Sequence, residues 1–392
     1  MISGQGTWKP ISVPSGPAGV HLVHDALRRA FDGDGLVAPI PQVSRHFPAA
    51  LVARIDSALN QSFSCQPDTV VIVTTSGSTG NPRAVEINLD SLTALNSFIN
   101  TGQVIDQEFD SALQWIAALP VTSIGGLNVL TRAVDSGLPP IPLESVAGAA
   151  PFTVDEVVLA VGKCSNFPAA ISLVPTQLRR LLGTQKGTEA LRNCALVLVG
   201  GAATPVSDQI RCLDEGIPAS FTYGMTETTG GCVFSGKPAP GVGIAIDSDT
   251  SVISLSGATI ATGYRPVPGG NQFEFFNSRF TTNDVGDIGS DGVLHVSGRV
   301  DDIVIINGVN ISLNAIKEII DSEPEIKDSF VLPNLTALIV TEKPMNSFED
   351  RLRHQISQQL GTLALPSFLQ VDLLPHLPNG KHDRQQIQTL YG

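Results

Sequence analysis

The stretch Thr74–Arg83, which reads TTSGSTGNPR, follows the short apolar run Val70–Val73. The β-branched residues of that run predict a buried strand. Small hydroxyl residues and two glycines then alternate in the loop, at Thr75, Ser76, Gly77, Ser78, Thr79 and Gly80. Glycine lets the backbone turn with positive φ, so several N–H groups can point at one anion, and the hydroxyls add donors. The strand and loop together predict a phosphate-binding site.

Two interpretations of this loop stay open when it is taken alone. It does not end in the Gly-Lys-Ser/Thr of a Walker loop. Surface turns rich in glycine and serine share its composition. The rest of the chain has to decide between a phosphate site and an ordinary turn.

Composition limits the classes of partner. The chain has 392 residues, 42% of them hydrophobic, which suits one to three domains with a sizeable core. Its net charge of −13 argues against nucleic acid as a partner. No apolar run approaches the ~18 residues of a membrane span. The five cysteines are scattered, without a CxxC pair or a zinc spacing, and they indicate reduced thiols in the cytoplasm.

The order of patterns predicts an α/β fold in two domains. Strands alternate with helices over residues 70–225, which predicts a parallel sheet with helices on both faces. From about Ile244, short strands and Gly-rich turns predict an antiparallel sheet or a small barrel. After Arg299 the pattern restarts with a strand at Ile303–Ile306 and a helix capped by Ser312. We therefore expect a large domain over 1–300 and a small α+β domain over 301–392.

A second motif, Tyr223–Thr228, also follows a predicted strand. Tyr223 offers a flat face for a purine, Thr226 a donor for phosphate and Glu227 a hard oxygen for Mg²⁺. Gly201 and Ala202 follow the strand before it. Ligands bind off the carboxyl ends of parallel strands, so we expect these segments to meet the phosphate loop there. The alternative for Glu227 is a first-turn residue that stabilises a helix dipole.

Two further motifs lie nearer the C-terminus. Asp284 follows Thr282 and Asn283, and a carboxylate in a turn can accept both hydroxyls of a ribose. Arg299 precedes Asp301, and a guanidinium binds ribose or phosphate bidentately. Lys381 lies in the segment PNGKHDR, residues 378–384. Turn chemistry and an exposed tail are the ordinary explanations of these short motifs.

Together, in this order, the four motifs resemble those of the acyl-adenylate-forming enzymes. The resemblance covers the chain from about residue 65 onward and implies ATP, Mg²⁺ and coenzyme A. It implies a mobile C-terminal domain that swings about Asp301 and carries the catalytic Lys381, with Thr226 and Glu227 as further catalytic residues and Glu227 on the metal. The implied nucleotide-binding residues are Thr75, Ser76, Gly77, Ser78, Thr79, Gly80, Gly201, Ala202, Tyr223, Gly224, Met225, Thr226, Asp284, Arg299 and Lys381.

Within this family, three segments are similar to those of the 2-succinylbenzoate–CoA ligases of menaquinone synthesis. They are residues 119–132, 172–178 and 223–238. This likeness implies that Arg132 binds the second carboxylate of the substrate, as a guanidinium does well. The alternative is an arginine that extends to water from a helix face.

Three positions depart from the family pattern. Arg83 stands where the phosphate loop ends in lysine, Ser123 where a histidine faces the acyl pocket, and Asn283 where glycine precedes the ribose-binding aspartate. Ser123 puts the acyl substrate in question more than the adenylation chemistry. Two alternatives therefore stay open: a ligase for another aryl or acyl carboxylate, and a nucleotide-binding module without catalysis. The sequence also leaves open whether the chain forms a homodimer.

Overall fold

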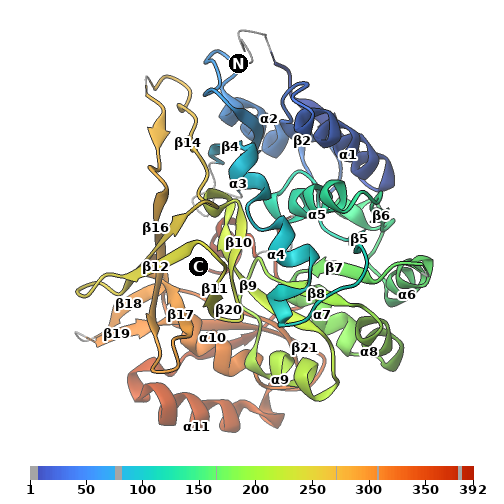
Figure 1. Ribbon diagram of the computed structural model, residues 1–392. Coiled ribbons are helices and arrows are strands. Elements are labelled where there is room, and N and C mark those ends of the chain that lie inside the picture. Colours follow the sequence, from blue (N-terminus) through green and yellow to red (C-terminus); the bar gives the residue numbers. More distant parts are fainter. Residues whose placement is uncertain (1–7, 76–81, 165, 271, 307–308, 378–381) are drawn as a thin grey trace.

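The computed structural model describes residues 8–75, 82–164, 166–270, 272–306, 309–377 and 382–392. Figure 1 shows a large part built around β7, β8 and β9, with the orange and red C-terminal part below it. A short parallel pair at the start of the chain joins β1 (Ile11–Val13) to β2 (Pro39–Pro41). Within the described ranges, no helix is both long and apolar enough to cross a membrane.

A seven-stranded sheet forms the centre of the large part, in the order β11-β10-β9-β8-β7-β5-β6. The five strands β5 to β9 pair in parallel, which confirms the predicted α/β sheet, and β10 and β11 add an antiparallel edge. The strands are β5 (Gln114–Ala117), β6 (Ile141–Pro142), β7 (Ala169–Leu173), β8 (Leu196–Val199), β9 (Ala219–Met225), β10 (Gly230–Phe234) and β11 (Lys237–Pro238). Their apolar side chains are buried in one continuous core that extends from Val13 to Leu294.

Helices surround this sheet in two groups, which Figure 1 shows at different heights on the right. In one group α1 packs on α5, and α5 packs on β5 and β7. In the other, α8 packs on both α6 and α7. The helices of the large part are α1 (Pro17–Phe31), α2 (Ala49–Leu59), α3 (Leu89–Thr93), α4 (Asn96–Asn100), α5 (Ile124–Ser136), α6 (Val154–Lys163), α7 (Pro175–Leu182), α8 (Gln185–Arg192) and α9 (Val206–Asp214).

One expectation about the phosphate loop is wrong. The strand before it, β3 (Thr69–Thr74), does not join the parallel sheet. It forms an antiparallel hairpin with β4 (Ala84–Asn88), in a separate sheet of order β15-β14-β4-β3 with β14 (Gly263–Tyr264) and β15 (Glu274–Phe275). An apolar run buried on both faces looks the same in a parallel and an antiparallel strand, so the sequence pattern could not separate the two.

A buried ion pair fixes this hairpin to the rest of the large part. Arg265 and Glu86 contact each other with side chains that are both fully buried. Arg265 also donates to three backbone carbonyls at and just after the end of α2, at 2.5, 3.0 and 2.7 Å, on Leu59, Asn60 and Phe63. The other Glu86 oxygen accepts from the Thr69 hydroxyl at 2.8 Å. Each donor and acceptor is satisfied, as a buried charge pair requires.

The region after Ile244 forms a four-stranded antiparallel sheet, one of the two forms expected, in the order β12-β13-β16-β17. Its strands are β12 (Val242–Ile246), β13 (Val252–Gly257), β16 (Arg279–Ile288) and β17 (Leu294–Arg299). Local patterns did not indicate β12 and β16 as separate strands.

The C-terminal part is α+β, as predicted, and has its own hydrophobic clusters over Ile311–Ala364 and Leu332–Ile387. A hairpin pairs β18 with β19, and a second sheet has the order β20-β21-β22. The elements are β18 (Ile303–Ile306), β19 (Val309–Ser312), α10 (Leu313–Asp321), β20 (Ile326–Val331), β21 (Thr336–Thr341), α11 (Glu349–Leu360), β22 (Ser367–Gln370) and α12 (Arg384–Tyr391). The domain boundary near residue 300 and the mobility of this part stay predictions.

Ser312 caps α10 as the sequence predicts, with its hydroxyl accepting from the Ala315 N–H at 3.2 Å. Replacing Ser312 with alanine is expected to lower the free energy of unfolding by about 1 kcal/mol, because that N–H loses its partner. Denaturant unfolding of the two proteins measures the change. Ser322→Ala, at the other end of the same helix, is the matched control and should cost less. Equal stability of wild type and Ser312→Ala would contradict the assigned cap.

Candidate functional site

The predicted purine and ribose residues lie together. Tyr223, near the end of β9, donates its hydroxyl to the Asp284 carboxylate at 2.8 Å. Burial and the negative charge of Asp284 raise the pKa of Tyr223 well above its usual range, so the hydroxyl keeps its proton. Asp284 on β16 pairs in register with Arg299 on β17, and Arg299 forms an ion pair with Asp301 at 3.2 Å. Four predicted residues from three segments therefore form one polar cluster.

The loop after β8 reaches the same edge of the sheet. β8 and β9 are parallel neighbours, so their carboxyl ends adjoin. A Cβ atom at Gly200 would lie 2.1 Å from the Thr222 hydroxyl oxygen, which explains the glycine there. Gly201 has a φ of 86° and turns the chain, and both it and Ala202 are exposed. The expected meeting of this loop with the Tyr223 motif is thus found.

Position 224, directly after Tyr223, requires glycine because the backbone of β10 lies too close for a side chain. A Cβ atom there would lie 2.1 Å from the Gly230 carbonyl oxygen. Thr226 and Glu227 then lie in a short 3₁₀ helix, η3 (Thr226–Thr228), and Met225 precedes it.

Glu227 is buried and accepts a hydrogen bond from the Tyr264 hydroxyl. The guanidinium carbon of Arg83 lies 3.4 Å from the centre of the Tyr264 ring, and Arg83 also forms a 2.5 Å ion pair with Glu274. The Arg83 N–H donates to the Thr75 hydroxyl at 3.0 Å. These contacts connect the two ends of the phosphate loop to the Tyr223 motif. Residues 76–81, including Ser76, Gly77, Ser78, Thr79 and Gly80, lie outside the described residues.

Glu227 fits the requirements of a magnesium ligand. The Tyr264 hydrogen bond occupies one carboxylate oxygen and orients the group. Mg²⁺ at a nucleotide takes one or two carboxylates together with phosphate oxygens and water, so a single oriented carboxylate suffices. Burial and the Glu227 charge raise the pKa of Tyr264, which therefore stays a donor.

Arg132 occupies a separate, buried position on α5. It is 6% exposed, lies 5.2 Å from the centre of the Trp115 ring and forms no ion pair with any residue in the described ranges. Its Nε hydrogen has no acceptor among the described residues. Burial lowers the pKa of this guanidinium to about 10, so it is charged at neutral pH. Arginine at the end of an exposed helix face would be hydrated, so that alternative is wrong.

A small cavity of ≈ 10 Å³ adjoins Arg132, room for about one water molecule. Asn128, Thr229 and Thr259 line it, and each contributes a buried polar atom without a partner. Asn128 donates to the Thr229 carbonyl at 2.7 Å, which joins α5 to the segment after Glu227. The cavity therefore combines an unpaired cation with unpaired polar atoms, close to the Tyr223 motif.

Ser123 is the residue at the N-terminal cap of α5. It precedes α5 and donates its hydroxyl to the Pro120 carbonyl at 2.7 Å. Nine residues of helix correspond to about 13 Å along the axis, so Ser123 and Arg132 cannot contact the same end of a small ligand.

The C-terminal part contacts this region through Arg384. Its guanidinium binds both carboxylate oxygens of Asp302, with Nη2 2.7 Å from Oδ2. That hydrogen bonding raises the pKa of Arg384, and the charges of Asp301 and Asp284 add to the effect. The segment that begins at His382 therefore approaches the Asp284 cluster. Lys381 itself lies outside the described residues.

Comparison with known proteins identifies the family. The model of the family described as "AMP-binding enzyme" matches residues 40–256. The chain belongs to the AMP-binding enzyme family. A relative named "Probable 2-succinylbenzoate--CoA ligase" from Mycobacterium tuberculosis is 30% identical over 97% of both chains. The 2-succinylbenzoate–CoA ligase of Bacillus subtilis is 27% identical over 82% of this chain and 68% of its own length. The resemblance stated from the sequence is confirmed.

Solved structures of AMP-binding enzymes share the fold. MatB from Rhodopseudomonas palustris with ATP gives a TM-score of 0.75 over 99% of this chain and 90% of its own, at 20% identity. O-succinylbenzoate coenzyme A synthetase (MenE) from Bacillus subtilis with ATP and magnesium gives 0.71 over 98% and 90%, at 22% identity. The predicted fold class is thus confirmed.

Tyr264 and Glu274 are contacts of the site that sequence reasoning missed. Both lie on the short strands β14 and β15, in a region that the sequence analysis treated only as sheet. Their contacts with Glu227 and Arg83 depend on tertiary pairing, and no local pattern signals them. The arginine at position 83 is a partial signal, because a planar guanidinium stacks on an aromatic ring better than an ammonium does.

Proposed function

We propose that this AMP-binding enzyme is an ATP-dependent, AMP-forming acid–CoA ligase that converts 2-succinylbenzoate to its coenzyme A thioester in menaquinone synthesis. The single observation that carries the substrate assignment is the buried, unpaired guanidinium of Arg132. A charge taken out of water without a partner is costly, and a substrate carboxylate would supply that partner. The relatives named above support the same substrate.

ATP is proposed to bind along the edge where β8 and β9 end. The phosphates lie on the loop from Thr75 to Gly80, the adenine on Tyr223 and the ribose on Asp284, with Arg299 beside it. Gly201 and Ala202 form the rest of the surface that contacts the adenine. Glu227 would hold Mg²⁺, which would neutralise phosphate charge. Thr226 donates to a phosphate oxygen.

The chemistry requires positioning and charge rather than a side-chain nucleophile. A carboxylate oxygen of the acid attacks the α-phosphorus, a bond to pyrophosphate breaks, and an acyl-adenylate forms. Lys381 bridges the attacking carboxylate and the α-phosphate. The thiol of coenzyme A then attacks the acyl carbon, and AMP leaves. Burial raises the pKa of all five cysteine thiols to about 11 or 12, so none is a reactive thiolate at neutral pH.

The deciding assay measures AMP release with ATP, coenzyme A and one acid at a time. We expect 2-succinylbenzoate to give a much higher kcat/KM than benzoate or medium-chain fatty acids, because only it can pair with Arg132. Preference for another acid would reassign the substrate within the same chemistry. ATP binding without AMP release with any acid would instead support a non-catalytic nucleotide-binding module.

Replacing Asp284 with alanine is expected to raise the KM for ATP about 10-fold, since a hydrogen bond from a ribose hydroxyl to a charged group is lost. Tyr223→Phe keeps the ring and removes only the hydroxyl that contacts Asp284. It is the control, and its KM for ATP should change by no more than about 2-fold. Pyrophosphate exchange measured against ATP concentration tests both. An unchanged KM in Asp284→Ala would remove Asp284 from the ribose site.

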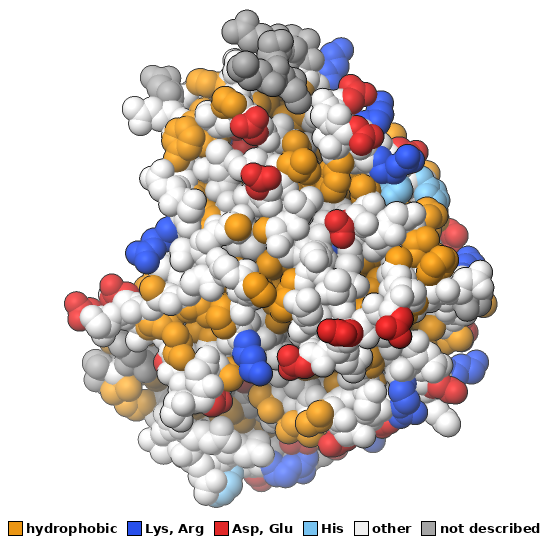
Figure 2. Space-filling view, in the orientation of Figure 1, with side chains coloured by type: hydrophobic (Ala, Val, Ile, Leu, Met, Phe, Trp, Pro, Cys, Tyr) orange, Lys and Arg blue, Asp and Glu red, His pale blue; other side chains and the backbone are white. Residues whose placement is uncertain are grey.

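The remaining partner assignments follow from this function. The substrates are a small carboxylate, ATP and coenzyme A. On the face drawn in Figure 2, acidic and basic side chains are interspersed. All five cysteines are free and four are buried, which supports the cytoplasm as the compartment. Sedimentation analysis would decide whether the enzyme is a homodimer.

A further inference from the structure

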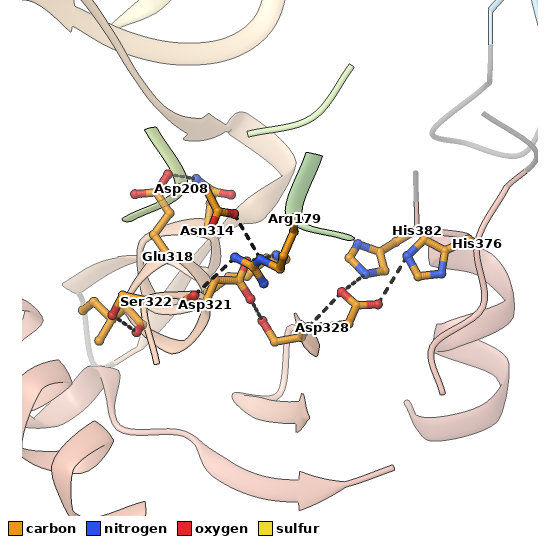
Figure 3. A network of polar contacts seen from close by, with 12 residues as sticks. Arg179, Asp208, Asn314, Glu318, Asp321, Ser322, Asp328, His376 and His382 are labelled. Atoms are coloured by element: carbon orange, nitrogen blue, oxygen red, sulfur yellow. Dashed lines mark hydrogen bonds and ion pairs between the residues drawn. The ribbon is translucent and has the colours of Figure 1, made fainter. Parts of the chain in front are cut away.

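Two histidines and one aspartate gather in the C-terminal part. The Asp328 carboxylate on β20 contacts the neighbouring rings of both His376 and His382, as Figure 3 shows. His382 Nε2 is 2.9 Å from one carboxylate oxygen, and His376 Nε2 is 3.3 Å from the other. One ligand atom from each residue lies within 4.8 Å of the other two.

The hydrogen bonding of His376 points to a cation at this cluster. Its Nδ1 lies 2.8 Å from the Leu374 carbonyl oxygen, and a carbonyl only accepts, so Nδ1 carries the proton. In the neutral ring, Nε2 then directs a lone pair at the Asp328 carboxylate. Two acceptors that face each other repel unless a positive charge lies between them. A metal ion bound by both groups would supply that charge.

We propose that Asp328, His376 and His382 bind a divalent transition-metal ion, with zinc as the best fit. Two imidazole nitrogens and one carboxylate form a ligand set that zinc takes in proteins. Bonds of ~2.0–2.1 Å in a tetrahedral site place ligand atoms ~3.3 Å apart. The two histidine nitrogens lie 2.9 and 3.3 Å from different oxygens of the Asp328 carboxylate. The fourth position would hold water.

The surroundings complete the site. His376 donates its Nδ1–H to a backbone carbonyl. A hydrogen bond of this kind orients a histidine metal ligand and fixes its tautomer. Asp321 lies beyond Ser329, whose hydroxyl donates to its carboxylate at 2.6 Å, and Lys317 forms an ion pair with the same aspartate. These two aspartates carry two negative charges against the one positive charge of Lys317, which favours a divalent cation.

The bound ion would fasten one segment of the chain to β20. His376 and His382 pair across an isolated antiparallel bridge, and both lie 19–30% exposed beside Asp328. The five residues between them include Lys381. A metal at this point would hold both His376 and His382 to β20.

The test uses the full-length protein, freed of metal and nucleotide, with zinc added against a chromophoric chelator. We expect one zinc ion per chain, with an affinity that falls about 100-fold or more in His376→Gln and in His382→Gln. His354→Gln, an exposed histidine on α11, is the matched control and should bind as the wild type does. Because the two histidine variants are measured separately, the test still decides if one of them fails to fold.

A second readout uses cobalt(II) in the wild-type protein. Tetrahedral nitrogen and oxygen ligands give intense visible absorption without the near-ultraviolet band of cobalt–thiolate bonds, which excludes the cysteines as ligands. Absence of zinc binding would overturn the proposal, as would equal zinc affinity in the wild type and both histidine variants. In either case the cluster would be an ordinary aspartate–histidine hydrogen-bond network.

Discussion

Replacing Arg132 with methionine is expected to raise the KM for 2-succinylbenzoate by about 10²-fold or more, while the KM for ATP stays unchanged. The reason is the loss of a buried charge that pairs with the second carboxylate, a change that costs about 2–5 kcal/mol. Methionine fills a similar volume beside Trp115, so the packing around the cavity is kept. Pyrophosphate exchange at varied acid and ATP concentrations measures both constants.

The same substitution is expected to stabilise the substrate-free protein. The guanidinium is buried with an unpaired Nε hydrogen, and its removal should raise the free energy of unfolding by about 1 kcal/mol. Thermal unfolding of both proteins without ligand tests this. Arg180→Met, on the exposed side of α7, is the control, because it introduces methionine without removing a buried charge. A variant that is less stable and unchanged toward the acid would mean that Arg132 has a structural role.

Replacing Lys381 with alanine is expected to slow acyl-adenylate formation by about 10²–10³-fold, because preorganised charge at the α-phosphate is lost. The effect should fall on kcat, with substrate affinities nearly unchanged. Single-turnover formation of the adenylate, without coenzyme A, isolates this step. The second half-reaction, measured from preformed adenylate, should proceed at close to the wild-type rate.

Lys343→Ala is the matched control, since Lys343 is an exposed lysine in the same C-terminal part. It should form adenylate as the wild type does. A Lys381→Ala enzyme that forms adenylate at the wild-type rate would remove Lys381 from the first step.

Local patterns predicted much of the C-terminal part and the meeting of Tyr223 with Asp284. The strand Ile303–Ile306 and the Ser312 cap are found where the sequence placed them. Tyr223 and Asp284 meet through a hydrogen bond although they lie far apart in the chain. Motifs that follow strands are predictable because parallel strands end at a common edge.

Contacts set by pairing between distant strands could not be predicted. The β3–β4 hairpin pairs with β14 rather than with the parallel sheet, and this pairing places Tyr264 against Glu227. The partners of Asp328 come from the other end of the C-terminal part. Neither His376 nor His382 lies at a sequence spacing that predicts a metal site, so the sequence did not indicate the histidine cluster.

The fully buried Arg265–Glu86 pair has a consequence for the order of assembly during translation. Its two members are 179 positions apart in the chain. The hairpin that holds the phosphate loop leaves the ribosome long before its arginine is made, and until then Glu86 has no counter-charge. Nascent chains that end before β14 therefore lack the ion pair that fixes this hairpin to the rest of the large part.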